Sequence, residues 1–169
     1  MDVFECIKTR RSIRAYKSKP IEEEKLMKIM EAARLAPSAH NHQPWKFILV
    51  RDDKKKKALS LACCGQKFVK DADTIVVGLG LKKHRFRNGI NSNAIDVTIA
   101  LEHIVLEAWE LGIGSCWILA FFPDKVRKIL KIPNDIDIVG ILTLGYPEEM
   151  PDQRPRKDIK EILCKEEFC

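Results

Sequence analysis

Three guanidiniums and a hydroxyl lie within five residues near the start of the chain, in the segment RRSIR at residues 10–14. A second polar segment, PSAHNHQPW, occupies residues 37–45. Guanidiniums are permanently charged and donate hydrogen bonds in a fixed fork, which suits a phosphate. The amides of Asn41 and Gln43 both donate and accept hydrogen bonds, which suits the edge of a planar heterocycle. Together the two segments predict a site for a phosphorylated ring cofactor.

The sequence carries none of the common signatures of nucleotide-binding loops or hydrolases. No GxGxxG follows a predicted strand and no GxxxxGK[ST] occurs, so dinucleotide and P-loop folds are disfavoured. A GxSxG elbow and an HExxH helix are also absent, which leaves a hydrolase without a clear nucleophile. The remaining polar candidates are Gln66, the turn at residues 114–121, and the basic pair Arg154 and Arg156.

The cysteines and histidines give little indication of a metal or redox centre. Six cysteines are scattered without a CxxC pair, so we expect most of them to be reduced and several to be buried. A Cys63–Cys64 redox pair is a weaker alternative. His40 and His42 lie two apart in the polar segment, but no partner Cys or His follows at a zinc-site spacing, so we expect no metal.

Charge and composition favour a cytoplasmic protein of one domain, residues 1–169. The net charge is +6, but the basic residues gather in short runs at 54–57, 82–87 and 154–157 that are typical of solvated loops. No helix-turn-helix, RNP-like or zinc-finger signature accompanies them, so nucleic acid is not an expected partner. No apolar run approaches the roughly 20 residues needed to span a bilayer, and the N-terminal residues lack a signal-peptide pattern.

The elements that must position the polar segments can be predicted from capping residues and periodicity. Asp2 and Glu5 predict a short helix over residues 2–9, followed by an extended crossing over residues 10–16. A second helix opens at the acidic run 22–24 and ends before Pro37. Its buried face consists of Leu26, Ile29, Met30 and Ala33. Residues 37–44 then form a polar loop.

Further along the chain, strands are predicted over residues 45–50, 74–81, 115–120 and 138–145. Short helices are predicted over 54–62 and 123–130, and residues 82–92 read as an exposed, mobile loop. A long helix, capped by Ser92 or Asn93, runs to Leu111 and is apolar on most faces. Residues 146–169 form a Pro- and charge-rich arm.

These elements favour an α+β fold with a small mixed sheet surrounded by helices over a doubly wound fold, because only four strands are clear. The long helix has more apolar surface than one sheet face can cover. This excess, together with the arm, predicts a dimer.

Four segments resemble the motifs of the FMN-dependent nitroreductase family, in the family's order and over nearly the whole chain. RRSIRAY at residues 10–16 is similar to the opening motif, and PSAHNHQPWKF at 37–47 is similar to the second. DVTIALEHIVLEAWELGIGSCWI at 96–118 resembles the central helix and the turn that follows it. LGYPEE at 144–149, with RPRK at 154–157, resembles the C-terminal end.

The resemblance implies an intertwined, obligate homodimer with one FMN in each of two clefts at the subunit interface, and an arm that embraces the partner. It places Arg10, Ser12 and Arg14 at the phosphate, the ribityl chain and the N1/O2 side of the flavin. Arg11 supplies further contacts to the same segment. Arg154 and Arg156 close on the phosphate.

The ring end of the implied site comes from three other segments. The partner subunit contributes Ser38, Asn41 and Gln43, and Gln66 matches a position that contacts the pyrimidine. Ile118, Leu119 and Ala120 lie along the isoalloxazine, with a backbone N–H near Leu119 or Ala120 facing N5. No catalytic side chain is expected, because the flavin carries the redox chemistry while the protein binds and tunes it.

The activity implied is hydride transfer from NADH or NADPH through FMN to a nitroaromatic, a quinone or a similar small acceptor, by a ping-pong mechanism. Two alternatives keep the fold: a family branch that fragments flavin or removes halogen reductively, and a flavin-binding or storage module without turnover. A basic nucleic-acid-binding domain is a fourth hypothesis. The natural substrate stays open, because residues 82–92 hold only a basic loop where larger members insert a covering helix.

Each candidate site residue also has a structural alternative. Arg10 and Arg11 could complement the dipole of the helix that they follow. Ser38 and Asn41 could build the turn after Pro37. Gln43, Arg154 and Arg156 could simply be solvent-exposed residues that bind no ligand.

Overall fold

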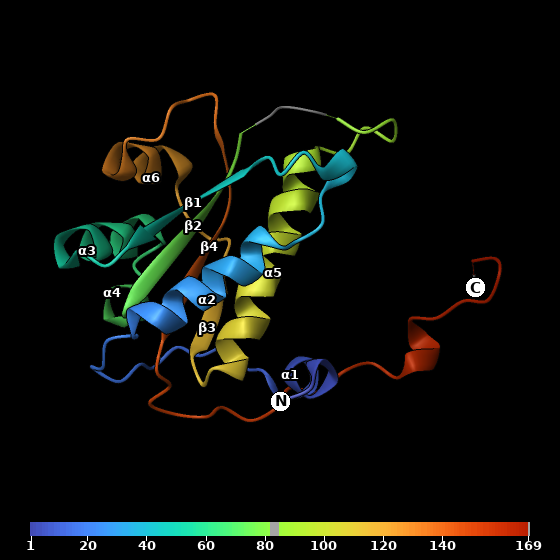
Figure 1. Ribbon diagram of the computed structural model, residues 1–169, viewed down its shortest axis with the longest axis horizontal. Helices are drawn as coiled ribbons and strands as arrows, with labels where there is room; N and C mark the ends of the chain where they lie inside the picture. The colour runs from blue at the N-terminus through green and yellow to red at the C-terminus, as the bar shows by residue number, and fades with distance from the viewer. Residues whose placement is uncertain (82–84, 169) are drawn as a thin grey trace.

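The computed structural model describes residues 1–81 and 85–168. A four-stranded sheet lies at its centre, with strand order β1-β2-β4-β3 (Figure 1). The strands are β1 (Trp45–Val50), β2 (Thr74–Gly80), β3 (Gly114–Ile118) and β4 (Asp137–Gly145). The α+β class predicted from the sequence is confirmed.

The sheet itself is antiparallel throughout its described strands, so the prediction of a mixed sheet was wrong in this respect. β2 and β3 point the same way, as two strands joined through a helix usually do. They are not neighbours, because β4 lies between them and pairs with both. One parallel contact remains at the outer edge of β3, an isolated bridge between Ser12 and Ser115.

Helices cover both faces of the sheet, because β2 and most of β4 are apolar on both sides. On one face lie α2 (Glu23–Arg34) and α5 (Ser92–Glu110), and on the other lie α3 (Asp53–Ala62), α4 (Phe68–Asp71) and α6 (Pro123–Leu130). Val76 packs with the first group, whereas its neighbours Ile75 and Val77 pack with the second. This alternation follows the period of two along a strand.

The helices begin and end close to the predicted positions. α1 (Val3–Thr9) is capped by Asp2, whose side chain accepts a hydrogen bond from the N–H of Glu5. α6 has the predicted bounds, and α2 buries three of the four predicted residues: Leu26, Ile29 and Ala33. The cap of α5 is Asn91 rather than Ser92 or Asn93.

The crossing at residues 10–16 and the arm run side by side along the β3 edge of the sheet. The N–H of Ile13 donates to the carbonyl of Ser115 at 2.9 Å. The absence of a side chain at Gly114 permits this approach, since a Cβ there would lie 2.6 Å from Ile13. The N–H of Glu148, at the root of the arm, donates to Ala15 at 3.0 Å.

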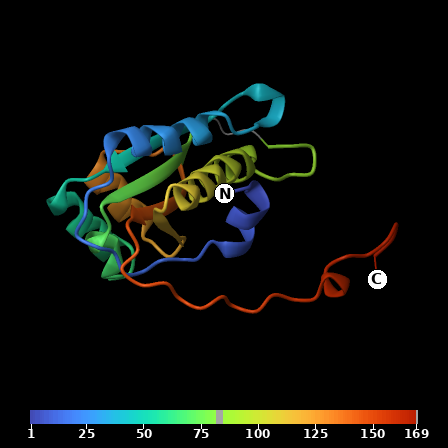
Figure 2. The same ribbon diagram turned by 60° about the horizontal axis from the view of Figure 1, so that its bottom comes forward.

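Beyond this root, the arm leaves the body of the molecule and is largely exposed. Figures 1 and 2 show it passing the α1 side and ending away from the sheet. Within its described residues, up to 168, the regular element is a short 3₁₀ turn, η2 (Ile159–Glu161). In the loop predicted at residues 82–92, residues 82–84 lie outside the described part of the chain, and 85–91 form a turn closed by a bridge between Arg85 and Asn91. No described helix is long and apolar enough to cross a membrane.

Candidate functional site

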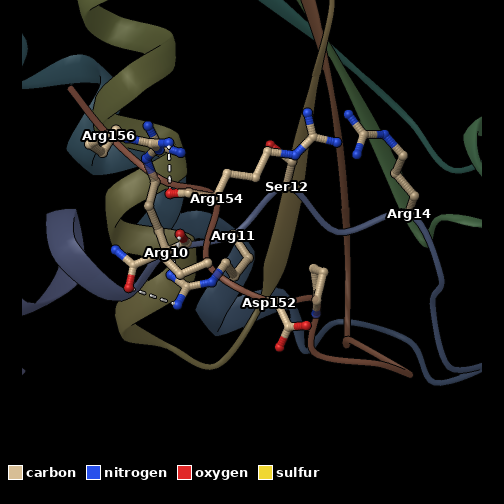
Figure 3. A pocket seen from close by; sticks show the side chains of 9 residues that line it. Arg10, Arg11, Ser12, Arg14, Asp152, Arg154 and Arg156 are labelled. Carbon is tan, nitrogen blue, oxygen red and sulfur yellow. Dashed lines mark hydrogen bonds between the residues drawn. The ribbon is translucent and has the colours of Figure 1, made fainter.

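A pocket with a volume of about 110 Å³ brings together the two basic segments from opposite ends of the chain (Figure 3). One wall is the crossing after α1, and the other is the arm just beyond its root. The residues that line this arginine pocket are Arg10, Arg11, Ser12, Arg14, Pro151, Asp152, Gln153, Arg154 and Arg156. Five guanidiniums therefore face one small volume, as the sequence predicted.

The arm is held against the end of α1 by Gln153. Its Nε2 donates to the carbonyl of Lys8 at 3.1 Å, and its Oε1 accepts from Arg11 Nη2 at 3.4 Å. Because Arg154 and Arg156 follow directly, these two bonds bring the basic pair of the arm to the pocket. The sequence analysis did not single out Gln153 or Asp152, although both directly precede the RPRK segment.

Arg11 contributes most of its side chain to the end of α1. Its Nη1 donates to the carbonyls of Thr9 at 2.6 Å and Arg10 at 2.9 Å, and more distantly to that of Lys8 at 3.4 Å. These carbonyls are left without helical partners where a helix ends, and a cation stabilises the negative end of the helix dipole. Arg11 therefore complements the end of the helix that it follows, which is the structural alternative given above. Its buried Nε has no hydrogen-bond partner in the described part of the chain.

The remaining guanidiniums carry more charge than their surroundings neutralise. Arg10 pairs with Glu102 at 3.5 Å. None of the ion pairs among the described residues involves Arg14, Arg154 or Arg156. Asp152 is the single carboxylate in the lining. Like charges held this close repel one another, so the arrangement fits an anion with several oxygen acceptors, such as a phosphate.

A second group of predicted residues lies where β3 ends. Gln66 donates to the carbonyls of Cys63 at 2.9 Å and Ala120 at 3.5 Å, which ties the segment after α3 to the segment after β3. Leu119 is 69% exposed, but Ile118 is only 2% exposed. The side chain of Ile118 is therefore buried, and this residue can line a ligand through its backbone alone. β3 ends two residues earlier than predicted, which frees Leu119 and Ala120 from the sheet.

Arg14 connects this second group with the arginine pocket. Its guanidinium lies 6.0 Å from the centre of the Phe68 ring, in α4 just beyond Gln66. Within the described chain, the predicted site residues outside the polar loop thus lie along the β3 side of the molecule. They are residues 10–14, 66, 118–120, 154 and 156. This arrangement agrees with a ligand that has a phosphate at one end and a planar group at the other.

The polar loop at residues 37–44 has an unusual backbone. A short 3₁₀ element, η1 (Ala39–Asn41), is followed by a turn that the side chain of Ser38 closes by accepting from the N–H of Gln43 at 2.9 Å. His40, Asn41 and Gln43 all have positive φ, at 49°, 55° and 48°. Such conformations cost energy in residues other than glycine and gather at functional sites.

This loop does not meet the arginine pocket within one chain. The N–H of Ala39 donates to Asp96, the fifth residue of α5, at 3.2 Å. The end of α1 instead contacts the last turn of α5, through Thr9 and Trp109. Figure 1 shows the loop and α1 at opposite ends of α5, which at 19 residues is about 28 Å long. None of Ser38, Asn41 and Gln43 lines the arginine pocket.

The cysteines behave largely as predicted, and three of the four described free thiols are buried. Cys6, Cys63 and Cys116 are buried, whereas Cys64 is exposed. Burial raises the pKa of the Cys63 thiol to about 11, which keeps it protonated at neutral pH. Cys164, in the arm, is disulfide-bonded. No group of three potential metal ligands occurs among the described residues.

The fold and the site together define an α+β protein with a strongly basic pocket between its N-terminal crossing and its C-terminal arm. Comparison with known proteins gives the family. The sequence profile of the nitroreductase family matches residues 7–87 and 64–146, and the chain belongs to this family.

Individual relatives and solved structures agree with the family assignment. The chain is 38% identical to a protein of Archaeoglobus fulgidus that is provisionally named an NADH dehydrogenase/NAD(P)H nitroreductase, with 88% of each chain covered. It is 30% identical to an FMN reductase [NAD(P)H] of Bacillus subtilis, over 92% of this chain and 70% of the relative. A crystal structure of a nitroreductase family protein from Clostridium novyi NT, 35% identical, superposes with a TM-score of 0.84 over 90% of this chain and 89% of that one.

Proposed function

We propose that the protein is an FMN-dependent oxidoreductase that uses NADH or NADPH to reduce a nitroaromatic, a quinone or a similar small acceptor by a ping-pong mechanism. The observation that carries the proposal is the arginine pocket, where four guanidiniums without carboxylate partners among the described residues face a cavity beside the end of β3. The names of the two curated relatives support the choice of cofactor and reductant.

The residues of this chain bind and orient the cofactor in this proposal. Arg10, Arg154 and Arg156 hold the phosphate, and Ser12 contacts the ribityl chain. Arg14 places its charge beside the N1/O2 edge of the ring, where a cation stabilises negative charge. When bound, FMN supplies the redox chemistry by accepting electrons from the nicotinamide and donating them to the acceptor.

The pyrimidine edge and the ring face have their own contacts. Gln66 reaches the pyrimidine edge, and the backbone at Leu119 and Ala120 faces the ring. After β3, the side chains of Leu119 and Phe122 are 69% and 49% exposed and offer apolar surface to a second planar molecule. No nucleophile or metal ligand is required of the protein.

The proposed molecule is a homodimer of single-domain subunits, in which the partner supplies Ser38, Asn41 and Gln43 to each site. The separation of this loop from the arginine pocket within one chain supports this arrangement. Exposed apolar side chains offer a surface for it: Phe4 on α1 is 69% exposed and Ile162 in the arm is 66% exposed. Such surface is typical of a subunit interface. The free, mostly buried thiols support a cytoplasmic location.

The proposal is tested by the colour of the protein and by its response to reductant. We expect the purified protein to be yellow, with FMN as the extracted chromophore. Anaerobic mixing with NADH or NADPH should bleach the flavin absorbance within one turnover time, and addition of a quinone should restore it. Parallel double-reciprocal plots in steady state would support the ping-pong mechanism.

The alternatives predict different outcomes of the same experiment. A yellow protein that neither nicotinamide bleaches is a flavin-binding module without turnover. A bleached protein that quinones and nitroaromatics fail to reoxidise belongs to another catalytic branch of the fold. A colourless protein with salt-sensitive affinity for DNA would contradict the proposal at its root.

A further inference from the structure

Glu102, in the middle of α5, contacts Arg10 of the arginine pocket and Trp117, which directly precedes residues 118–120 of the proposed flavin site. Its Oε1 lies 3.5 Å from Nε of Arg10, and its Oε2 accepts a hydrogen bond of 3.2 Å from Nε1 of Trp117. Among the five guanidiniums of the arginine pocket, Arg10 is the one that has a carboxylate partner within the described residues. One carboxylate thus joins the residue that ends α1 to a residue near the end of β3.

Both partners of Glu102 have restricted positions. The N–H of Arg10 donates to the carbonyl of Cys6 at 3.0 Å, which fixes its backbone at the end of α1. The Trp117 ring lies against Gly140, where a Cβ would be only 2.9 Å from the ring. Trp117 directly precedes Ile118, Leu119 and Ala120. The carboxylate therefore fixes the direction of the Arg10 side chain relative to the strand that leads to the ring end of the site.

The ion pair between Arg10 and Glu102 contributes little to the stability of the fold. The side chains of Arg10 and Glu102 are 32% and 38% exposed, and ion pairs with this exposure contribute little to stability. A carboxylate near a phosphate site also opposes the binding of an anion through its charge. Glu102 favours anion binding only if the free energy gained by orienting Arg10 exceeds the free energy lost to this repulsion.

We propose that Glu102 is a positioning residue for FMN binding, which holds the Arg10 guanidinium toward the phosphate and in register with β3. The inference rests on the function proposed above. It makes an unusual prediction, since removal of a negative charge beside an anion site should weaken the binding of the anion.

The test is a titration of the apoprotein with FMN and, in parallel, with riboflavin, followed by quenching of flavin fluorescence. Glu102→Gln should bind FMN about five- to tenfold more weakly than the wild type, because one carboxamide oxygen cannot serve both donors. Riboflavin lacks the phosphate, so its affinity should change by less than about twofold. A purely electrostatic role for Glu102 predicts tighter binding of FMN instead.

Two matched variants control for the change in charge. Asp152 lines the same pocket and has no ion-pair partner among the described residues, so Asp152→Asn should tighten FMN binding. Glu107 lies on the same helix but pairs with Lys28 at 3.1 Å, away from the pocket, so Glu107→Gln should leave FMN affinity unchanged. Unfolding of each variant by urea checks that the fold is intact.

A double-mutant cycle separates positioning from a general structural effect. In an Arg10→Ala background, Glu102→Gln should weaken FMN binding no further, because the guanidinium that it orients is gone. Equal weakening in both backgrounds, or tighter FMN binding by the single Glu102→Gln variant, would overturn the inference while the proposed function stands. A wild-type apoprotein that fails to bind FMN would overturn both.

Discussion

Arg11 and Arg14 lie three residues apart and carry the same charge, but their side chains have different surroundings. Arg11 donates to the carbonyls that end α1, whereas Arg14 lies beside Phe68 at the junction of the two groups of site residues. We therefore expect Arg11→Ala to lower the free energy of unfolding by about 1 kcal/mol with a small effect on FMN affinity. Arg14→Ala should weaken FMN binding by about tenfold and have a small effect on the free energy of unfolding.

Urea denaturation and FMN titration measure the two effects independently. Lys8→Ala is a suitable control, because Lys8 is an exposed cation on α1 that pairs only with Glu5, at 3.5 Å. Its removal should change both quantities little. Loss of FMN affinity in Arg11→Ala with unchanged stability would show that the assignment of the two roles is reversed.

The adjacent cysteines should differ in reactivity. Cys64 is exposed, whereas burial raises the pKa of Cys63 to about 11. Because the thiolate is the reactive form, iodoacetamide at neutral pH should label Cys64 well before Cys63. Peptide mapping by mass spectrometry after a short pulse checks this order. Equal labelling of both thiols in the folded protein would contradict the buried position of Cys63.

At the scale of elements, the root of the arm is fastened to the start of α2 through Tyr146. Its hydroxyl donates to Glu22 and accepts from Lys25 Nζ at 2.9 Å, and Lys19 lies 4.0 Å from the ring centre. The hydrogen bond from Tyr146, with help from the backbone and Lys19, lowers the pKa of Glu22 from 4.5 to about 2. The charged carboxylate is therefore the form that the fold favours.

This lowered pKa gives a stability that depends on pH. Because the folded pKa lies below the unfolded one, the contribution is complete above about 4.5 and is lost as the pH falls toward about 2. In Glu22→Gln the melting temperature should be lower at neutral pH and should decline less than that of the wild type across this window. Glu24→Gln, an exposed carboxylate of the same helix, should retain the wild-type profile.

Local patterns in the sequence predicted most elements within one or two residues, because capping residues and apolar periodicity act locally. β1 and α6 have the predicted bounds. The start of α5 was less certain, since Asn91, Ser92 and Asn93 can all act as caps. Strand direction was not predictable, because it depends on where β4 inserts, and no local pattern encodes this.

The arginine pocket unites residues that stand out as charge clusters in the sequence, whereas an isolated charge such as Glu102 does not stand out. Arg10, Arg14, Arg154 and Arg156 stood out as clusters and do share one pocket. Glu102 gave no signal, because a carboxylate on a long helix usually faces solvent and its partners are distant in sequence. Only the crossing of α1 and β3 near the middle of α5 reveals its position.

At the scale of the whole molecule, the separation of the polar loop from the arginine pocket predicts complementation between subunits. Arg10→Ala and Asn41→Ala should each weaken FMN binding in a homodimer. A mixed dimer of the two variants should contain one cleft with both substitutions and one with neither. We therefore expect it to bind about one FMN per dimer with wild-type affinity, measured by titration after purification with two different affinity tags.

The controls for complementation are the two variant homodimers, mixed in the same proportions without exchange of subunits. They should show no high-affinity site. A mixed dimer that binds no more tightly than the variant homodimers would mean that Arg10 and Asn41 act in the same subunit. Stoichiometric FMN on a protein that light scattering shows to be monomeric would exclude the interface site altogether.

The position of β4 also limits when the protein can fold during its synthesis. β2 and β3 are made first, and the strand that pairs with both of them in the sheet is β4, residues 137–145 of the chain. A nascent chain that has not yet reached these residues exposes the apolar edge of β2 with no strand to pair with it. The arginine pocket forms later still, since half of its lining follows residue 150. We therefore expect the ribosome-bound chain to stay open to chaperones until residues 137–145 have emerged, and the pocket to form only once residues 151–156 follow.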